Sequence, residues 1–124
     1  MVRFGMSTFT VSATLIHPER RERSVALDLL VDTGATYTLL PAEVVAELEL
    51  PTLEECLVEL ASGEQAAYGM GEVRVRLGGR ERATVFLAGP PGCHGLLGAV
   101  TLEELGLTAD PRHQRLLPAP PALL

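Results

Sequence analysis

The sequence of 124 residues contains no Lys, Asn or Trp, and all ten of its basic residues are Arg. Sixteen acidic residues outnumber them, so the formal net charge is −6. A protein that binds nucleic acid by neutralising phosphates needs a surplus of basic residues, so this charge argues against that class of partner. A hydrophobic content of 47% with 21% charged residues excludes a largely disordered chain.

Long apolar runs are also lacking, and no stretch approaches the roughly 18 apolar residues of a membrane-spanning helix. We therefore expect no membrane contact. Ser and Thr interrupt residues 1–16, which consequently have no apolar signal-peptide segment. Cys56 and Cys93 are too few and too far apart for a disulfide framework, so we expect free thiols and a cytoplasmic protein.

Histidine is scarce, with three in the chain. The adjacent Cys93 and His94, together with His113, admit the reading of a metal-binding β domain. However, neighbouring residues on an extended chain point to opposite faces and cannot easily share one metal ion. We therefore expect no metal site and no cofactor. His17, which precedes a proline, and His113, in a polar run, are both expected at the surface.

What the sequence does contain is alternation of apolar and polar residues with period two, which predicts β-strands. The paired glycines Gly78 and Gly79 predict a two-residue hairpin turn. Short strands with turn signals between them indicate a single all-β domain, a barrel or a sandwich. The predicted strands cover residues 9–15, 25–31, 56–60, 65–68, 73–77, 83–88 and 114–117.

Two short helices interrupt this pattern. Pro41 is placed to begin the first, and Pro51 prevents its continuation. Thr101 and Glu104 have the spacing of a capping box for the second, which Gly106 would close. The domain is expected to cover residues 1–117, followed by a flexible Pro-rich tail over residues 118–124.

The segment with residues suited to catalysis is Asp32-Thr33-Gly34, at the end of the second predicted strand. A buried strand delivers a carboxylate at its end, and a hydroxyl and a glycine follow. A short turn of this kind can hold the carboxylate against its own backbone amides and so fix its orientation.

The residues Leu30-Val31-Asp32-Thr33-Gly34-Ala35, followed far downstream by Leu96-Leu97-Gly98 and a helix, resemble the retropepsin-like aspartic proteases. The resemblance covers roughly residues 8–117. It implies a closed retropepsin-like β-barrel with one or two short helices. It also implies an aspartic endopeptidase in which two carboxylates activate one water molecule.

The resemblance further implies a homodimer, because the chain has a single Asp-Thr-Gly and Asp28 lies on the same strand as Asp32. Catalysis would then use Asp32 from both copies. In the family, the threonine, here Thr33, bonds across the two-fold axis, while Gly34 allows close approach of substrate. Ala35 would lie under the carboxylates. Leu96, Leu97 and Gly98 would support the loop from beneath. A flap at Ala61, Ser62, Gly63 and Glu64 would close over an extended peptide substrate.

Two positions depart from retroviral members of the family. Thr36 and Ala99 stand where an acidic residue and an Arg often pair to brace the dimer. Because both partners are replaced together, no orphan charge results. This pattern favours a cellular or prokaryotic branch. A dimeric peptide-binding or assembly module with little or no proteolysis is the alternative, since a fold does not guarantee an activity.

Overall fold

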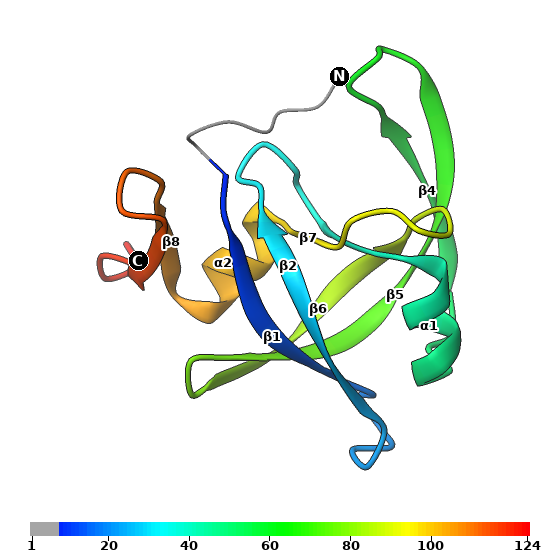
Figure 1. Cartoon of the computed structure of the whole chain (residues 1–124), viewed down its shortest axis with the longest axis horizontal. Coiled ribbons are helices and arrows are strands. Elements are labelled where there is room, and N and C mark those ends of the chain that lie inside the picture. The colour runs from blue at the N-terminus through cyan, green and yellow to red at the C-terminus, as the bar shows by residue number, and fades with distance from the viewer. Residues whose placement is uncertain (1–7) are drawn as a thin grey trace.

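The predicted alternation does form strands, and most of them join one large sheet (Figure 1). The structure is a computed structural model that describes residues 8–124, so the first seven residues of the expected domain 1–117 lie outside the described residues. The elements are β1 (Thr10–Ile16), β2 (Ser24–Val31), β3 (Thr38–Leu40), α1 (Ala42–Leu48), β4 (Glu54–Glu59), β5 (Gln65–Leu77), β6 (Arg80–Ala88), β7 (Leu96–Leu97), α2 (Ala99–Leu105), β8 (Leu107–Asp110) and β9 (Arg115–Pro118).

Seven strands form the main sheet in the order β1-β2-β7-β3-β6-β5-β4. β1 also pairs antiparallel with β5, with Leu15 opposite Val75, so the first strand of this order contacts the sixth. β8 and β9 form a separate two-stranded sheet. The all-β class with two short helices is therefore confirmed, because each helix has only seven residues. Within residues 8–124, no helix is long and apolar enough to cross a membrane.

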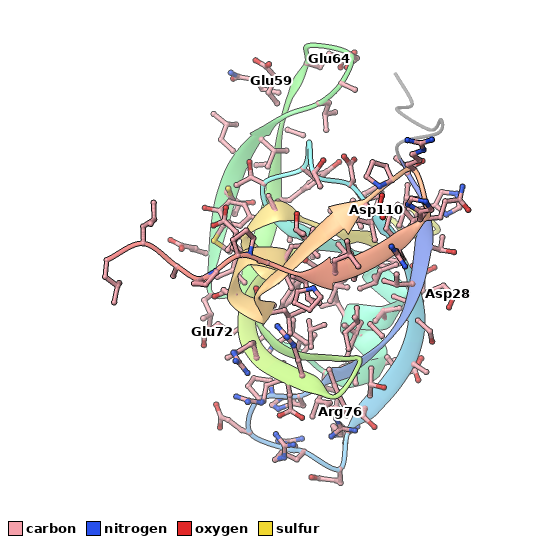
Figure 2. The ribbon with its side chains drawn as sticks, turned by 90° about the vertical axis from the view of Figure 1, so that its left-hand side faces the viewer. Asp28, Glu59, Glu64, Glu72, Arg76 and Asp110 are labelled. Atoms are coloured by element: carbon pink, nitrogen blue, oxygen red, sulfur yellow. The ribbon has the colours of Figure 1, made fainter. Side chains whose placement is uncertain are left out.

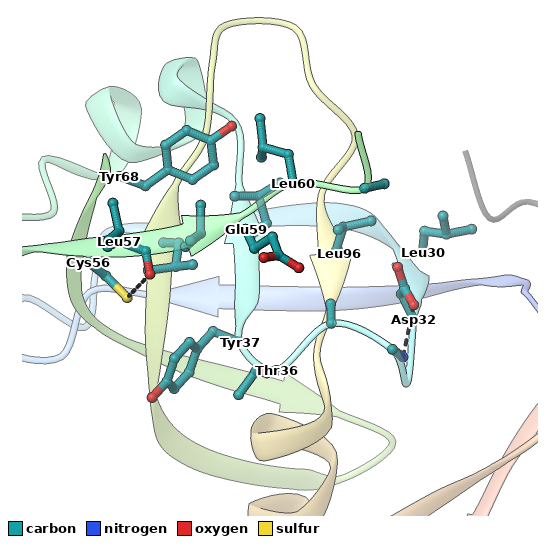
Figure 3. Close-up of a pocket in the computed structure, with 16 residues that line it drawn as sticks. Leu30, Asp32, Thr36, Tyr37, Cys56, Leu57, Glu59, Leu60, Tyr68 and Leu96 are labelled. Carbon is teal, nitrogen blue, oxygen red and sulfur yellow. Dashed lines mark hydrogen bonds between the residues drawn. The ribbon is translucent and has the colours of Figure 1, made fainter. Parts of the chain in front are cut away.

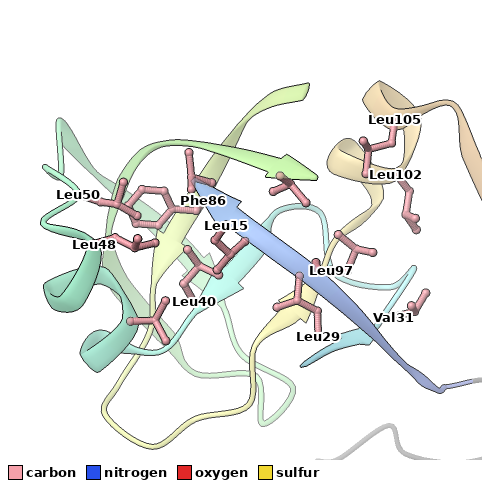
Figure 4. Packing of buried hydrophobic residues seen from close by; sticks show 14 of the residues in the cluster. Leu15, Leu29, Val31, Leu40, Leu48, Leu50, Phe86, Leu97, Leu102 and Leu105 are labelled. Atoms are coloured by element: carbon pink, nitrogen blue, oxygen red, sulfur yellow. The ribbon is translucent and has the colours of Figure 1, made fainter. Parts of the chain in front are cut away.

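The hydrophobic core lies between the inward faces of these strands (Figure 4). Each fully buried Leu or Phe contributes about 1.5 to 3 kcal/mol relative to exposure. The cluster therefore fixes β2, which leads into the Asp32 loop, and β7, which pairs with β2. The side chains with 0% or 1% exposure include Leu15, Leu29, Val31, Leu40, Leu48, Val73, Val75, Phe86, Leu97 and Leu105.

β5 is one continuous strand of 13 residues, whereas the sequence predicted two strands at 65–68 and 73–77. Gly69 and Gly71 lie between the two predicted strands, and glycine generally weakens a strand interior. In the structure, a Cβ on Gly71 would collide with the carbonyl oxygen of Pro51. Glycine is thus a packing requirement within this strand, and β5 runs unbroken from the β4–β5 hairpin into the core.

The predicted hairpin at Gly78 and Gly79 is confirmed. Both residues have positive φ, 58° and 83°, as a two-residue turn between antiparallel strands requires. Leu77 of β5 pairs with Arg80 of β6 directly across this turn.

The first helix is also confirmed. Pro41 is the N-cap residue of α1, and Val44 and Leu48 form its buried face. The chain leaves the helix at Glu49, which adopts the left-handed conformation with φ 54°, just before Pro51. The carboxylate of Glu49 forms an ion pair at 2.8 Å with Arg23, which directly precedes β2.

For the second helix, the capping-box prediction was wrong. α2 begins at Ala99 with Gly98 as its N-cap residue, so Thr101 lies inside the helix and is fully buried. Its hydroxyl pairs with buried hydroxyls on neighbouring strands instead of with helix amides. Gly106 ends the helix with φ 69°, as predicted.

The C-terminal hairpin contains a strand, β8, that the sequence did not indicate. β8 pairs with β9, which confirms the last predicted strand at 114–117 but extends to Pro118. The backbone N–H of Ala119 donates to the carbonyl of Gly106 at 2.8 Å. The Pro-rich segment 118–124 is therefore attached to the domain at its first two residues.

His17 is buried, with 7% exposure, and the prediction that it lies at the surface was wrong. Its Nδ1 accepts the backbone N–H groups of Glu19 at 3.1 Å and Arg20 at 3.0 Å. The ring thus satisfies amides of the turn that follows β1, which offsets the cost of burying a polar group. His113 is exposed, as predicted.

Candidate active site

Asp32 directly follows β2, in a tight turn that fixes the direction of its carboxylate. The backbone N–H of Gly34 donates to Oδ1 of Asp32 at 3.0 Å, and the N–H of Ala35 donates to its carbonyl at 3.1 Å. The prediction that this turn holds the carboxylate against its own amides is confirmed. The preceding Val31 is 1% exposed, so the acid begins where the buried strand ends.

The segment around β7 supports this loop from beneath. Leu30 and Val31 pair in parallel with Leu96 and Leu97, and the N–H of Asp32 donates to the carbonyl of Leu97 at 3.1 Å. The backbone of the catalytic candidate therefore continues the hydrogen-bonding pattern of a buried parallel pair. This hydrogen bond attaches the Asp32 backbone to the sheet below it.

The loop also caps α2. The first amides of a helix lack partners within the helix, and Gly98 has no side chain to cap them. The N–H of Ala99 donates to the carbonyl of Ala35 at 2.8 Å, and that of Val100 donates to Thr36 at 3.0 Å. Helix and loop therefore satisfy each other's backbone groups.

Gly98 makes room for the loop, as the family resemblance implied. A Cβ at this position would collide with the carbonyl group of Tyr37 and would lie 2.8 Å from the nitrogen of Thr38. The N–H of Gly98 donates to Oγ1 of Thr38 at 3.2 Å. Any side chain at position 98 would push the Asp32 loop away from β7.

A chain of buried hydroxyls continues inward from Thr38. Oγ1 of Thr38 lies 2.7 Å from that of Thr101, which lies 2.8 Å from that of Thr84. Thr84 donates to the Glu104 carboxylate at 2.5 Å. Because an ionised carboxylate only accepts, Thr84 must accept from Thr101, and Thr101 from Thr38. The direction of the hydrogen bond that each of these three threonine hydroxyls donates is therefore assigned.

A cleft of about 540 Å³ opens above the Asp32 loop (Figure 3). Its floor includes residues of the loop, and β4 with the start of the β4–β5 turn forms the facing wall. Most of the remaining surface is apolar. The lining residues are Leu30, Asp32, Gly34, Ala35, Thr36, Tyr37, Leu39, Cys56, Leu57, Val58, Glu59, Leu60, Ala61, Tyr68, Leu87 and Leu96.

The structure brings together part of the predicted site. Asp32, Gly34, Ala35 and Ala61 all line the cleft. Thr33 points elsewhere, to a separate hollow of about 210 Å³ that residues of α2 and β8 also line.

The other three flap residues, Ser62, Gly63 and Glu64, lie at the exposed tip of the β4–β5 hairpin and do not line the cleft. Gly63 has φ 91°, and its N–H donates to the carbonyl of Leu60 at 2.8 Å. The N–H of Leu60 donates to the carbonyl of Glu64 at 2.7 Å, which closes the turn. The tip is thus a well-formed turn above the cleft rim.

The aromatic lining of the cleft was not predicted from the sequence. Tyr37 and Tyr68 are the only tyrosines in the chain, and both line the cleft. Their scarcity could have identified them as candidate site residues, because a chain with only two tyrosines has both of them at this cleft. Leu57 and Glu59 of β4 were missed as well, since only the tip of the hairpin was assigned to substrate.

The described structure does not form a metal site from Cys93, His94 and His113. Among residues 8–124, no three His, Cys, Asp or Glu side chains form a group that could hold a metal ion. The ring of His113 instead lies 2.9 Å from the Asp110 carboxylate, and this hydrogen bond lowers the pKa of Asp110. Burial raises the pKa of the Cys93 thiol, so it is a poor nucleophile at neutral pH.

Comparison with known families agrees with this geometry. A family model described as aspartyl protease matches residues 23–101, which include the Asp32 loop, the β4–β5 hairpin and Gly98. No curated protein matches the sequence. The match covers more than half of the chain, and the chain therefore belongs to the retropepsin-like aspartyl protease family.

Proposed function

We propose that the protein is an aspartic endopeptidase whose active site is completed by the Asp32 carboxylate of a second copy of the chain. The observation that carries this proposal is the placement of Asp32 at the floor of the cleft, with its carboxylate oriented by the Gly34 amide. Membership of an aspartyl protease family supports peptide hydrolysis as the reaction.

The need for a second copy follows from the chemistry, because aspartic proteases use two carboxylates around one water molecule. Asp32 is the only Asp that lines the cleft. Asp28 is exposed on β2, and Asp110 is engaged with His113 and Arg115 in the separate two-stranded sheet. A two-fold axis beside Asp32 would bring two identical carboxylates together.

Two such carboxylates in contact hold one proton between them, since like charges at that distance cannot both ionise. The ionised carboxylate takes a proton from water, and the resulting hydroxide oxygen attacks the scissile carbonyl carbon. The other carboxyl group gives its proton to the carbonyl oxygen, so a neutral gem-diol forms. On collapse, a diol hydroxyl returns a proton, the leaving nitrogen gains one, and the C–N bond breaks.

An extended peptide suits the cleft. β4 is the last strand in the order of the main sheet, so one edge of it is unpaired within residues 8–124. Such an edge offers backbone N–H and C=O groups that an extended chain can pair with.

Thr33 is exposed on the other side of the loop, where it is accessible to a second copy.

The test is hydrolysis of a peptide library by the purified protein, with cleavage products identified by mass spectrometry. Asp32→Asn should abolish cleavage while the circular dichroism spectrum stays unchanged. Asp28→Asn is the matched control, because Asp28 is an exposed acid on the same strand, and should retain full activity. Turnover by the Asp32→Asn variant, or no cleavage by the wild type in its dimeric state, would refute the proposal and favour a binding module.

The two cysteines support a location. Cys56 and Cys93 are both free thiols, and free thiols are typical of reducing compartments. We place the protein in the cytoplasm on this ground. Fractionation of the source cells with an antibody to the protein would test the assignment.

A further inference from the structure

The charges of this chain are segregated along the sequence. Residues 24–73 contain ten acidic residues and no Arg, Lys or His, whereas all ten Arg lie outside this segment. The same segment provides the Asp32 loop, α1, β4 and most of β5. Figure 2 shows the result: Glu59 and Glu64 lie on the β4–β5 hairpin at one end of the molecule, and Arg76 lies at the other.

Several acids away from the cleft are compensated. The carboxylate of Glu81 accepts hydrogen bonds from Arg21, Arg74 and Arg76 at 2.7 to 3.3 Å. Glu49 forms an ion pair with Arg23 at 2.8 Å. Glu81 and Glu49 are thus acids away from the cleft whose charge is paired with Arg.

Glu59 differs from these acids. No Arg or His of the described chain forms an ion pair with it. It is the last residue of β4 and lines the cleft, and Figure 3 shows its carboxylate directed into the space between β4 and the loop that carries Asp32. Asp32 and Glu59 are the only charged side chains among the lining residues, and no basic side chain is among them. Among the described lining residues, the charged side chains that a peptide meets are therefore negative.

We infer that Glu59 is a specificity-determining residue that selects substrates with an Arg or Lys side chain beside the scissile segment. The inference rests on the proposed function, since it assigns a substrate class to the same cleft. A cleft with charges of one sign and low-dielectric walls concentrates ligands of the opposite sign. The leucines around it, Leu30, Leu39, Leu87 and Leu96, accept apolar side chains at the other positions of the peptide.

The experiment uses one peptide that the wild-type protein cleaves, resynthesised with Arg, Gln or Glu at each position in turn. At one position, Arg should raise kcat/KM about two- to fivefold over Gln, and Glu should lower it, as expected for an exposed ion pair. Glu59→Gln should remove this preference, and Glu59→Arg should invert it towards the Glu peptide. Sodium chloride at about 1 M should reduce the wild-type preference.

Glu55→Gln is the matched control. Glu55 is exposed on the same side of β4, four residues away, and does not line the cleft, so its replacement should leave the preference unchanged. An Arg preference that survives in Glu59→Gln, or equal rates for the three peptides with wild type, would overturn the assignment.

Binding of the same labelled peptides to Asp32→Asn, measured by fluorescence anisotropy, separates this inference from the proposed function. A charge preference in binding that depends on Glu59, without any cleavage by wild type, would sustain the role of Glu59 and refute the peptidase. Cleavage by wild type without any charge preference would support the peptidase and refute the role of Glu59.

Discussion

The hydroxyl of Thr38 lies 2.7 Å from that of Thr101, although 63 residues separate them in the sequence. Thr38 follows the Asp32 loop, and Thr101 lies in α2, which the same loop caps. The contact therefore ties the back of the active loop to the helix below it. Both side chains are fully buried, so the bond is sheltered from water.

Replacement of Thr101 by Val should lower the free energy of unfolding by about 1 to 3 kcal/mol, because the hydroxyls of Thr38 and Thr84 would each lose a buried partner. Thr101→Ser keeps the hydroxyl and should restore most of the loss. Urea denaturation at fixed protein concentration measures both. Thr108→Val, at an exposed position of β8, is the control and should change stability by less than about 0.5 kcal/mol.

Gly98→Ala should reduce peptide hydrolysis far more than a comparable glycine replacement elsewhere. The added methyl group would collide with the Tyr37 carbonyl and displace the active loop. Gly79→Ala is the comparison: it meets no atom within 4 Å but has φ 83°, which costs about 1 to 2 kcal/mol for a non-glycine residue. Activity per folded molecule should fall only for Gly98→Ala. Equal activity of the two variants would show that the loop tolerates the contact.

Glu81→Gln should weaken the dependence of stability on acid pH. Hydrogen bonds from Arg21 and Arg74 lower the pKa of Glu81 from its ordinary value near 4.5 to about 2. This carboxylate therefore stabilises the fold fully above about pH 4.5, and the contribution is lost as the pH falls towards 2. Thermal unfolding should separate wild type from Glu81→Gln more at pH 7 than at pH 2.5. Glu72 is an exposed acid on β5, so the difference in thermal unfolding between wild type and Glu72→Gln should be about the same at pH 7 and at pH 2.5.

Specific activity should fall on dilution, because each subunit contributes half of the proposed catalytic pair. Sedimentation velocity over the same concentrations should show dimer converting to monomer with the same midpoint. A rate strictly proportional to chain concentration, down to concentrations at which sedimentation shows monomer, would contradict a shared site.

The rate of hydrolysis should have a bell-shaped dependence on pH. A pair of carboxylates that shares one proton titrates in two macroscopic steps, and only the singly protonated pair is active. Steady-state kinetics of kcat/KM across a pH series measures this. A rate that rises without limit towards alkaline pH would indicate a different chemistry.

The strands and the Asp-Thr-Gly motif were predictable because both are local. Alternating side chains identify β1, β2 and β6 from their own residues, and Asp32-Thr33-Gly34 is three consecutive positions. The paired glycines at the β5–β6 turn likewise carry their signal locally, through the conformation that such a turn requires.

The errors arise where distant segments decide the outcome. Thr101 has the spacing of a helix cap, but its hydroxyl is used by two strands instead. Gly71 lies between the two strands predicted at 65–68 and 73–77, yet it continues β5 and admits the Pro51 backbone. β3 has three residues and is therefore too short to show any alternation.

For the site, the sequence indicated Asp32 and the hairpin but not which hairpin residues face the acid. The register between β4 and the loop depends on tertiary packing, so Glu59 could not be assigned to the cleft. Tyr37 lies in the loop before β3 and Tyr68 lies in β5, so their placement along one cleft depends on the path of the whole sheet.

The anchoring of Asp32 by Leu97 and of Ala35 by Ala99 has a consequence for biosynthesis. The ribosome makes the acidic loop some 65 residues before the segment that holds it in place. The contacts that attach this loop to β7 and to α2 therefore cannot form until residues up to about 101 have emerged, so the proposed active site is completed late in synthesis.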